Sequence, residues 1–343
     1  MEDLKMGKII SKSFLLLFFA VIICSVVYPL ILLLIGQTFF PFQANGSMVK
    51  GPDGKIVGSL LIAQPFSKDE YFQPRPSAAS YDASASSSSA LAASNYALRD
   101  RVARTLGPIV KYDGGTKSGQ LVAPDIENWF QHDMYQSNRH IVAQWASIHS
   151  SDAQAWVKTD SLHTAYVADW AKKHKEIVAQ FVKSNPSIPQ PAPADIAVTF
   201  FQCFSNDNPG KFLSLMTETG TDGKLKKVIQ LVSVGSDIQS IFFDMWRTDH
   251  PTDKLQDIPG DMVTTSASGL DPDITMQNAM YQLDRVSSKW AVDLKQNTII
   301  IRKEIEDILK KSAYAPFNGL AGEEMVNVLQ VNLELRNRFG TPQ

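Results

Sequence analysis

An uninterrupted apolar run near the amino end is the feature that most constrains this chain. Residues 14–36 read FLLLFFAVIICSVVYPLILLLIG, 23 residues without a charge, and no charged side chain occurs between Lys12 and Lys50. Coiled as an α-helix, such a run is about 34 Å long, and the hydrocarbon core of a bilayer is about 30 Å thick. The sequence therefore predicts a transmembrane helix over 14–36, preceded by a tail at 1–13.

The residues that flank this run predict its orientation. Lys5, Lys8 and Lys12 precede it, and the 13 residues after it carry neither Lys nor Arg. The positive-inside rule then places the amino terminus in the cytoplasm and the chain from about residue 37 onward in the periplasm or outside the cell. A cleaved signal peptide is the alternative, but its apolar core is only about 7 to 15 residues long and ends at small residues. The segment IGQTF at 35–39 offers no such cleavage site, so we expect the helix to be retained.

Charge and cysteine content exclude several classes of function. The 343 residues include 33 Lys and Arg against 35 Asp and Glu, a net charge of −2. A nucleic-acid-binding protein usually presents a strongly basic surface, so no nucleic-acid partner is expected. The two cysteines, Cys24 and Cys203, are too few and too far apart for a disulfide-rich framework, a four-thiolate zinc site or an iron–sulfur cluster.

The chain directly after the predicted span reads as short strands and turns. Between residues 37 and 110, strands are predicted at 56–57 and 60–62 from short apolar stretches. The segment SAASYDASASSSSALAAS at 77–94 contains 15 Ser or Ala among 18 residues. It has too few large apolar side chains to form a core of its own, so we expect a loop that is held by other surfaces.

The rest of the chain differs in texture. Residues 124–249 carry apolar side chains at helical spacing, which predicts a module of amphipathic helices. Residues 261–340 predict a polar turn, a helix capped by Thr275, and a second helix. The alternation of apolar and polar residues in 328–335 predicts a half-buried strand. The fold class expected is α+β: one amino-terminal transmembrane helix, then a mixed extracytoplasmic domain interrupted by a helical insertion.

No sequence motif of a catalytic or metal site is present. The chain has no GxxxxGK[ST] nucleotide loop, no HExxH and no CxxCH motif. Five of its histidines lie 8, 9, 14 and 11 residues apart, whereas ligand pairs on one helix need spacings of about three or four. These are His132, His140, His149, His163 and His174. The sequence therefore predicts no catalytic residue and no metal site.

Two groups of polar residues leave alternatives open. Asp271 and Asp273 lie two apart in a turn, where they serve either as carboxylates for a cation or, as we favour, as turn and cap residues. Arg75 lies between two prolines and close to Tyr71 and Phe72. A stiffly held arginine of this kind anchors on carboxylates or carbonyls, either within the chain or on a partner.

Several short motifs follow the predicted span in a specific order: FPFQANGS at 40–47, GSLLIAQPF at 58–66, YFQPRPSA at 71–78 and VTTSASGLDPDIT at 263–275. In this order they resemble the KdpC family, the C subunit of the bacterial potassium-transporting Kdp P-type ATPase. The resemblance covers residues 1–110 and 258–338, 191 of the 343 positions. It divides the chain into a KdpC-like domain at 37–110 plus 258–343 and an insertion of unknown role at 111–257.

The resemblance implies a non-catalytic accessory subunit of a high-affinity potassium uptake pump, anchored by a single span in the bacterial inner membrane. Its partners would be a channel-like potassium-binding subunit, the P-type ATPase catalytic subunit, a small membrane subunit and the lipid bilayer. ATP and potassium would be used by the complex, with no cofactor assigned to this chain. The subunit would serve assembly and stability of the complex.

The resemblance also suggests where such contacts lie. Candidate partner contacts are Pro29, Tyr71, Phe72 and Arg75, and Gln64 lies in a region associated with ATP affinity. The family's motif turn comprises Ser268, Gly269, Asp271 and Asp273. Because the predicted orientation places Gln64 outside the cytoplasm, we expect any effect on ATP use to be indirect coupling through the complex.

Two further functions remain as alternatives. The chain is either a pump subunit or a membrane-anchored periplasmic module that binds a ligand or a metal through the insertion. A third interpretation, compatible with the first, makes the insertion an interaction or shielding device added to the pump.

Overall fold

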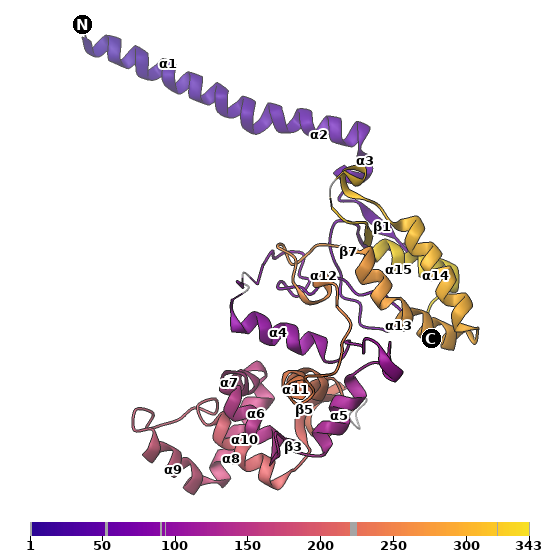
Figure 1. Ribbon diagram of the computed structural model, residues 1–343. Helices are drawn as coiled ribbons and strands as arrows, with labels where there is room; N and C mark the ends of the chain where they lie inside the picture. Colours follow the sequence, from indigo (N-terminus) through magenta and orange to yellow (C-terminus); the bar gives the residue numbers. More distant parts are fainter. Residues whose placement is uncertain are drawn as a thin grey trace. The chain divides into compact units, whose positions relative to one another are not determined.

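The computed structural model describes residues 2–51, 54–89, 91–92, 94–219, 225–320 and 322–342. Two compact units divide the chain (Figure 1). Unit 1 comprises Met1–Ala90 and Pro259–Gln343, and unit 2 comprises Leu91–Ile258. Unit 2 is therefore inserted within the sequence of unit 1, and it begins 20 residues before the predicted insertion at 111–257.

The amino-terminal helix contains a local irregularity next to a proline. It runs through α1 (Glu2–Ile22), a π-helical turn (Ile23–Val27) and α2 (Tyr28–Phe39). Pro29 has no N–H and its ring clashes with the carbonyl four residues earlier. The helix accommodates this through the wider turn, in which the Tyr28 N–H donates to the Ile23 carbonyl. Within the described residues, Ser11–Phe39 is the one stretch long and apolar enough to cross a membrane.

After the amino-terminal helix, the described part of unit 1 combines two small antiparallel sheets with three further long helices. Strand β1 (Met48–Lys50) pairs with β2 (Ile56–Ser59), and β7 (Asp273–Thr275) pairs with β8 (Met325–Asn327). The helices are α13 (Met276–Leu294), α14 (Thr298–Ser312) and α15 (Val328–Phe339), with the short helices α3 (Pro41–Ala44) and α12 (Gly260–Val263) and a 3-10 turn at Pro316–Gly319. Their inward faces form one core, which includes Phe72, Val286, Trp290, Ile305, Val331 and Leu335. The α+β class with an amino-terminal helix is confirmed.

Each of the three long helices of unit 1 begins at a side chain that caps it. The Thr275 hydroxyl accepts from the Asn278 N–H at 3.1 Å, as the sequence predicts. Asn297 accepts from the Ile299 N–H at 2.8 Å, and Asn327 accepts from the Gln330 N–H at 3.1 Å. Such caps satisfy backbone donors that the first helical turn leaves without partners.

The predicted strand over 328–335 is wrong, because these residues form most of α15. Val328, Val331, Asn332 and Leu335 are buried, and their spacing of three, four and seven residues follows a helix rather than a strand. The alternating pattern is compatible with both structures. Val331 and Leu335 are four residues apart, so they face the same side of a strand and also lie close together on one face of a helix. The Asn327 cap decides in favour of the helix.

The predicted strand at 60–62 is also wrong. Here the Ser59 hydroxyl accepts from the Leu61 N–H at 3.1 Å, and the Ile62 N–H points to the Ser59 carbonyl at 3.4 Å. A serine that bonds its own local backbone in this way favours a turn over a strand ladder.

Unit 2 is mainly helical, as predicted, and contains two hairpins that the sequence reading did not anticipate. Its helices are α4 (Tyr96–Leu106), α5 (Ala123–Gln131), α6 (Ile141–Ile148), α7 (Ser150–Thr159), α8 (Ser161–Lys173), α9 (Lys175–Ser184), α10 (Ala197–Asp207) and α11 (Ser236–Asp249), with a 3-10 turn at Gly115–Lys117. Strand β3 (Met134–Tyr135) pairs with β4 (Asn138–Arg139), and β5 (Phe212–Thr219) pairs with β6 (Leu225–Val232). Trp145 lies at the centre of an aromatic core.

Candidate functional site

The two motif loops, residues 71–78 and 263–275, lie against each other in unit 1. The Ser77 hydroxyl donates to the Gly269 carbonyl and also accepts from two backbone N–H groups on its own side of the contact. The Ser87 N–H donates to the Ser268 carbonyl at 3.0 Å, and the Ala63 N–H donates to the Leu270 carbonyl at 2.9 Å. Segments almost 200 residues apart in the sequence are therefore joined through the backbone carbonyls of the turn at residues 268–270.

Gly269 permits this close approach. Its φ is +71°, and a Cβ built there would lie 2.7 Å from the Ser87 carbonyl oxygen and 3.0 Å from the Ala79 nitrogen. Any other residue would both strain the backbone and collide with it. The motif glycine is thus required by the packing of the two loops.

Arg75 is held inside the motif loops. Its Nη1 lies 3.4 Å from Asp271 Oδ2, and its Nη2 donates to the Thr265 carbonyl at 3.3 Å. The Tyr81 hydroxyl donates to the Arg75 carbonyl at 2.9 Å, and burial raises the pKa of Tyr81. Of the two interpretations of Arg75, these contacts describe the internal anchor, and contact with a partner stays a prediction.

Asp271 and Asp273 are engaged in the turn that leads into β7. Asp271 Oδ1 accepts from the Asp273 N–H at 3.1 Å. The Asp273 carboxylate accepts from the Tyr314 hydroxyl at 2.9 Å and from Asn327 Nδ2 at 3.2 Å. Burial raises the pKa of Asp273, the two hydrogen bonds oppose that effect, and the negative charge of Asp271 adds to it. These contacts favour the turn role over the cation role.

Tyr314 shares this environment with Asp273. Burial, the hydrogen bond to Asp273 and the negative charge of that carboxylate raise the pKa of Tyr314 to about 12. The hydroxyl therefore stays protonated at neutral pH and remains a donor to Asp273.

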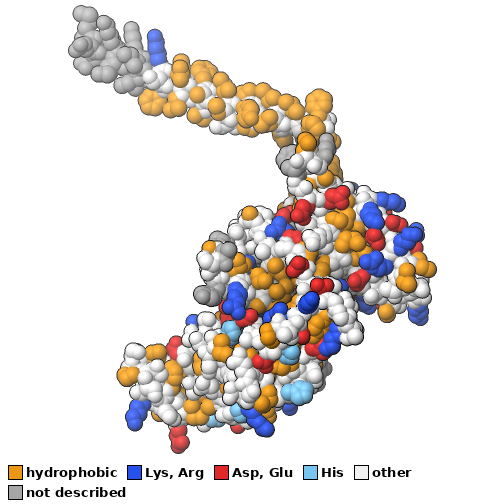
Figure 2. All heavy atoms as spheres, in the orientation of Figure 1, with side chains coloured by type: hydrophobic (Ala, Val, Ile, Leu, Met, Phe, Trp, Pro, Cys, Tyr) orange, Lys and Arg blue, Asp and Glu red, His pale blue; other side chains and the backbone are white. Residues whose placement is uncertain are grey.

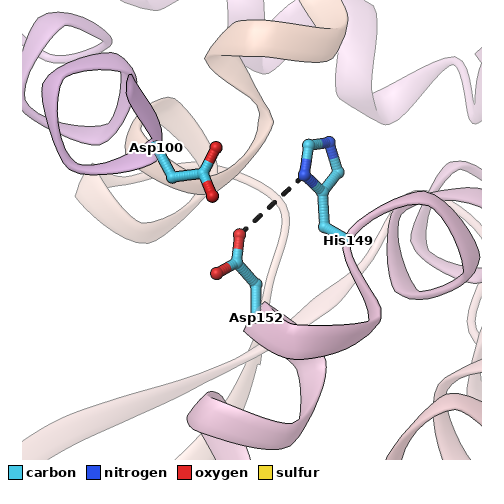
Figure 3. Close-up of side chains that lie close together, drawn as sticks. All are labelled: Asp100, His149 and Asp152. Carbon is cyan, nitrogen blue, oxygen red and sulfur yellow. Dashed lines mark ion pairs between the residues drawn. The ribbon is translucent and has the colours of Figure 1, made fainter. Parts of the chain in front are cut away.

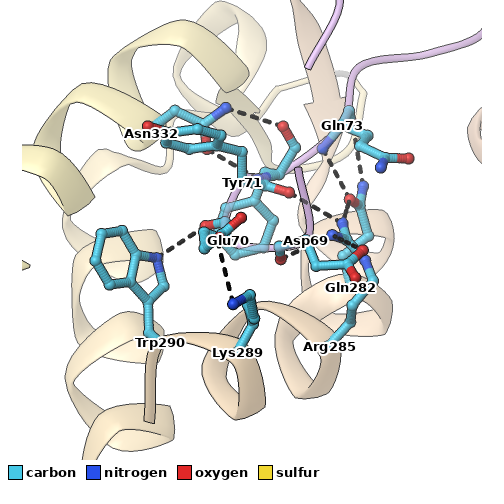
Figure 4. A network of polar contacts seen from close by, with 10 residues as sticks. Asp69, Glu70, Tyr71, Gln73, Gln282, Arg285, Lys289, Trp290 and Asn332 are labelled. Atoms are coloured by element: carbon cyan, nitrogen blue, oxygen red, sulfur yellow. Dashed lines mark hydrogen bonds and ion pairs between the residues drawn. The ribbon is translucent and has the colours of Figure 1, made fainter. Parts of the chain in front are cut away.

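The segment 69–73 begins in a turn, in which the Tyr71 N–H donates to the Lys68 carbonyl, and side chains rather than a strand supply most of its other partners (Figure 4). The Phe72 N–H donates to Asn332 Oδ1 at 2.9 Å, and Asn332 Nδ2 donates to the Phe72 carbonyl at 2.9 Å. Gln282 forms the same two-way contact with Gln73, at 2.8 and 3.0 Å. Each side-chain amide thus satisfies both the N–H and the carbonyl of one residue, as a residue of a neighbouring strand would do.

Helix α13 supplies the remaining partners of this segment. Trp290 Nε1 donates to the Glu70 carbonyl at 2.8 Å. Arg285 donates to the Asp69 carbonyl at 2.8 Å and to the Tyr71 carbonyl at 3.0 Å. Lys289 Nζ lies 3.5 Å from Glu70 Oε1 and 2.8 Å from Asp293 Oδ1. The segment is therefore locked against the helix by groups that the sequence reading did not single out.

The predicted partner residues occupy different environments. Phe72 is fully buried in the core, whereas Tyr71 is half-buried, with its ring 5.4 Å from that of Phe66. Burial raises the pKa of Tyr71. Gln64 is half-buried, and its Nε2 donates to the Val57 carbonyl at 3.1 Å. The structure joins the motif residues of 64–75 to the 268–273 turn. Pro29 lies in the apolar helix α2 and takes no part in these contacts.

Buried polar side chains on helices were the signal that sequence reasoning missed. Asn278, Gln282 and Asn332 are nearly inaccessible to solvent within otherwise apolar helix faces. A buried amide requires partners for both its N–H and carbonyl groups, so such positions point to a backbone segment that lies against the helix.

Comparison with known proteins shows which protein family matches the segments that contain the motif loops. The family model of the K⁺-transporting ATPase c chain, KdpC, matches residues 10–128 and 237–337. The KdpC subunit of the potassium-transporting ATPase from Caulobacter vibrioides is 44% identical over 115 residues, which cover 31% of this chain and 58% of that protein. The corresponding subunit of Pseudomonas aeruginosa is 48% identical over 83 residues, 24% of this chain and 45% of that protein.

A more distant relative matches almost the whole chain. The KdpC subunit from Clostridium kluyveri is 24% identical over 331 residues, 96% of this chain and 94% of that protein. By contrast, the chain spans only about half the length of the Caulobacter and Pseudomonas relatives. The family model covers more than half of the chain and includes both motif loops, and the chain therefore belongs to the KdpC family.

Proposed function

We propose that this chain is a membrane-anchored accessory subunit of a potassium-transporting P-type ATPase complex. It serves the assembly and stability of the complex and carries none of the groups that transfer phosphate. Its partners are the channel-like potassium-binding subunit, the catalytic P-type subunit and the small membrane subunit. ATP and potassium are used by these other subunits.

The family match carries this proposal. Both matched segments contain a motif loop, and the related proteins from Caulobacter, Pseudomonas and Clostridium all bear the name of a potassium-transporting ATPase subunit. The contacts of the motif loops also indicate a structural role, because Arg75, Asp271 and Asp273 all have partners within unit 1. Residues engaged in this way hold a surface in shape, which suits an assembly role.

The amino-terminal helix supports membrane anchoring. Its apolar side chains are exposed along its length (Figure 2). Phe39, Phe40 and Phe42 are exposed where the helix ends, and aromatic side chains favour the boundary between lipid and water. With Lys12 before the apolar stretch, we assign the amino terminus to the cytoplasm and the chain from about residue 37 onward to the outer side.

This orientation makes any effect on ATP affinity indirect. Gln64 donates to a backbone carbonyl of unit 1, on the side of the membrane opposite to the nucleotide. We therefore expect Gln64→Ala to leave the KM for ATP of the assembled complex unchanged. An increased KM with normal assembly would instead show that Gln64 influences nucleotide binding by the complex.

The test is co-expression of the tagged chain with the other pump subunits, followed by extraction in mild detergent. We expect a P-type ATPase and a channel-like protein to co-purify, and potassium-stimulated ATP hydrolysis to be lost without the tagged chain. Replacing residues 14–36 by an unrelated transmembrane helix of equal length should keep the chain in the membrane but abolish co-purification. Co-purification that survives this exchange would place the contact in units 1 and 2.

A second function, a membrane-anchored ligand- or metal-binding module, is favoured by the separate core of unit 2. Ser89 Oγ and Thr265 Oγ1 lie 3.1 Å apart in unit 1, so a short flexible linker can replace residues 91–258. Potassium-stimulated activity that persists in this variant supports the accessory role of unit 1. Loss of activity with normal assembly would assign the essential function to unit 2.

A further inference from the structure

Three side chains of unit 2 converge from two separate segments. Asp100 lies on α4, His149 joins α6 to α7, and Asp152 lies in the first turn of α7. One ligand atom of each residue, a carboxylate oxygen or an imidazole nitrogen, lies within 4.8 Å of those of the other two. Figure 3 shows all three side chains pointing toward a common space.

The corner between α6 and α7 holds His149 firmly. Its N–H donates to the Trp145 carbonyl at 2.8 Å, and its carbonyl accepts from the N–H groups of Asp152 and Ala153 at 2.9 and 3.0 Å. His149 and Asp152 are each only 20% exposed. The backbone that carries both side chains is therefore held in one turn, with His149 Nδ1 3.9 Å from Asp152 Oδ2.

The charges around this space are incompletely compensated. Arg104 lies 2.9 Å from Asp152 Oδ2, and Arg99 binds both oxygens of Asp244 at 2.8 and 3.0 Å. Among the residues that the structure describes, none forms a hydrogen bond or ion pair with the half-buried carboxylate of Asp100. A cation between Asp100 and His149 would give this carboxylate a partner of opposite charge.

A cavity opens beside Asp100 and His149 and provides room for an ion with its water ligands. It has a volume of about 370 Å³, and Asp100, His149 and Asp244 contribute to its lining. Space of this kind distinguishes the cluster from a closed ion pair, because a metal with three protein ligands completes its coordination with water.

We propose that unit 2 binds a divalent transition-metal ion through His149 Nδ1 and the carboxylates of Asp100 and Asp152. One imidazole with two carboxylates suits ions such as Zn²⁺ better than Mg²⁺ or Ca²⁺, which prefer oxygen ligands alone. Zn²⁺ bonds of about 2.0 to 2.2 Å require the ligand atoms to approach to about 3.3 Å, which side-chain rotation supplies. The bound ion ties α4 to the corner between α6 and α7.

Histidine spacing along the chain does not reveal this site. His149 supplies the only imidazole of the cluster, and Asp100 lies 49 residues before it. A search for histidine pairs on one helix therefore passes over a site that tertiary packing assembles.

The test is titration of the purified full-length chain in detergent with Zn²⁺ by calorimetry, and with Co²⁺ by its visible absorption. Asp100→Asn and His149→Gln are expected to weaken Zn²⁺ binding by at least about 10- to 100-fold, since even outer-shell changes have effects of that size. The matched control is His132→Gln, which removes an exposed histidine of the same unit. It should bind Zn²⁺ like the unmodified chain.

Arg104→Gln provides a test that misfolding cannot imitate. The guanidinium competes with the ion for Asp152, so its removal should tighten Zn²⁺ binding at least about threefold. The proposal is overturned if the unmodified chain binds no Zn²⁺ at millimolar concentration, or if Asp100→Asn and His149→Gln bind as it does. It is also overturned if His132→Gln weakens binding equally, or if Arg104→Gln fails to tighten it.

Discussion

The two units of this protein stabilise their interiors in different ways. In unit 2, Trp145 is packed edge-on against Phe201 and Phe212, with ring centroids 5.2 and 5.5 Å apart. In unit 1, the buried surroundings of Phe72 are mainly aliphatic, and the backbone of Phe72 is bonded on both sides by one amide, that of Asn332.

The two kinds of interior differ in how many amino-acid substitutions they tolerate. Aromatic and aliphatic packing accepts many sequences of similar volume. A buried backbone segment that is satisfied by individual amides accepts few, because each lost partner leaves a buried polar group unpaired. The motif loops belong to the second kind. Their short, ordered motifs therefore reflect the partners that a buried segment demands.

Placing a charge in the core of unit 1 should cause the largest loss of stability. The same experiment tests whether residues 328–335 form a helix or a strand. Val331 is fully buried and Leu333 is half-buried. Val331→Asp should cost more than about 4 kcal/mol and prevent unit 1 from folding, because the new charge has no partner. Leu333→Asp should cost about 1 kcal/mol, because it can reach solvent. Equal losses in thermal unfolding would contradict the helical assignment, since only a strand makes the two positions equivalent.

Trp145→Ala tests the aromatic core of unit 2. Removing a fully buried tryptophan should cost about 3 to 5 kcal/mol of stability, through lost contacts and the cavity left behind. Hydrogen exchange of peptides from each unit measures where protection is lost. We expect the loss within unit 2 alone, and an equal loss in peptides of unit 1 would show that the units unfold together.

Asn332→Ala tests the amide-held segment directly. It leaves the Phe72 N–H and carbonyl without partners, and each unpaired buried group costs about 1 to 3 kcal/mol. The expected total is at least about 2 kcal/mol, measured by chemical denaturation. Asn337→Ala, an exposed asparagine on the same helix, is the matched control and should change stability by less than about 0.5 kcal/mol. If both variants are equally stable, the segment is not held by Asn332.

Gly269→Ala tests the contact between the motif loops. The positive φ and the 2.7 Å approach to Ser87 should together cost about 1 to 3 kcal/mol. Gly260→Ala is the control, because a Cβ at that position would have no atom within 4 Å and the backbone there needs no glycine. A stable Gly269→Ala variant, in a melting experiment beside Gly260→Ala, would show that the loops can separate at little cost.

The smallest effect concerns the pH dependence that Asp273 contributes. Because the folded protein raises the pKa of this carboxyl, the native state holds its proton to higher pH than the unfolded chain does. Asp273 therefore disfavours folding progressively as the pH rises from about 4 through its folded pKa. Asp273→Asn keeps a carbonyl acceptor but cannot ionise. Its stability relative to the unmodified chain should increase between pH 3 and pH 7, and a decrease would mean that the hydrogen bonds to Tyr314 and Asn327 outweigh burial.

Local patterns in the sequence predicted the features that depend on neighbouring residues. The apolar run before residue 37 corresponds to the long helix that ends at Phe39. Thr275 caps α13 as expected. The motif order pointed to the family that the comparison shows. In each case the information lies within a few residues, in hydropathy, in a cap or in a short motif.

Predictions failed where local patterns are ambiguous. The alternation in 328–335 fits a strand and a helix face equally, and only the Asn327 cap with the buried Asn332 distinguishes them. The boundaries 111 and 257 of the insertion were inferred from the extent of the family resemblance, and the two compact units of the structure meet at 90–91 and 258–259. Helix α4 precedes residue 111 in the sequence but packs on α11 within unit 2.

The sequence by itself determined the long apolar helix at the amino end, the helical character of most of the chain and the family, because these depend on composition and on residues adjacent in the chain. Only the tertiary structure decided which polar groups meet. Asn332 reaches Phe72 across 260 residues, Arg75 reaches Asp271 across 196, and Asp100 faces His149 from another helix. Such pairs form because burial forces each polar group to find a partner, and packing alone sets which partner is within reach.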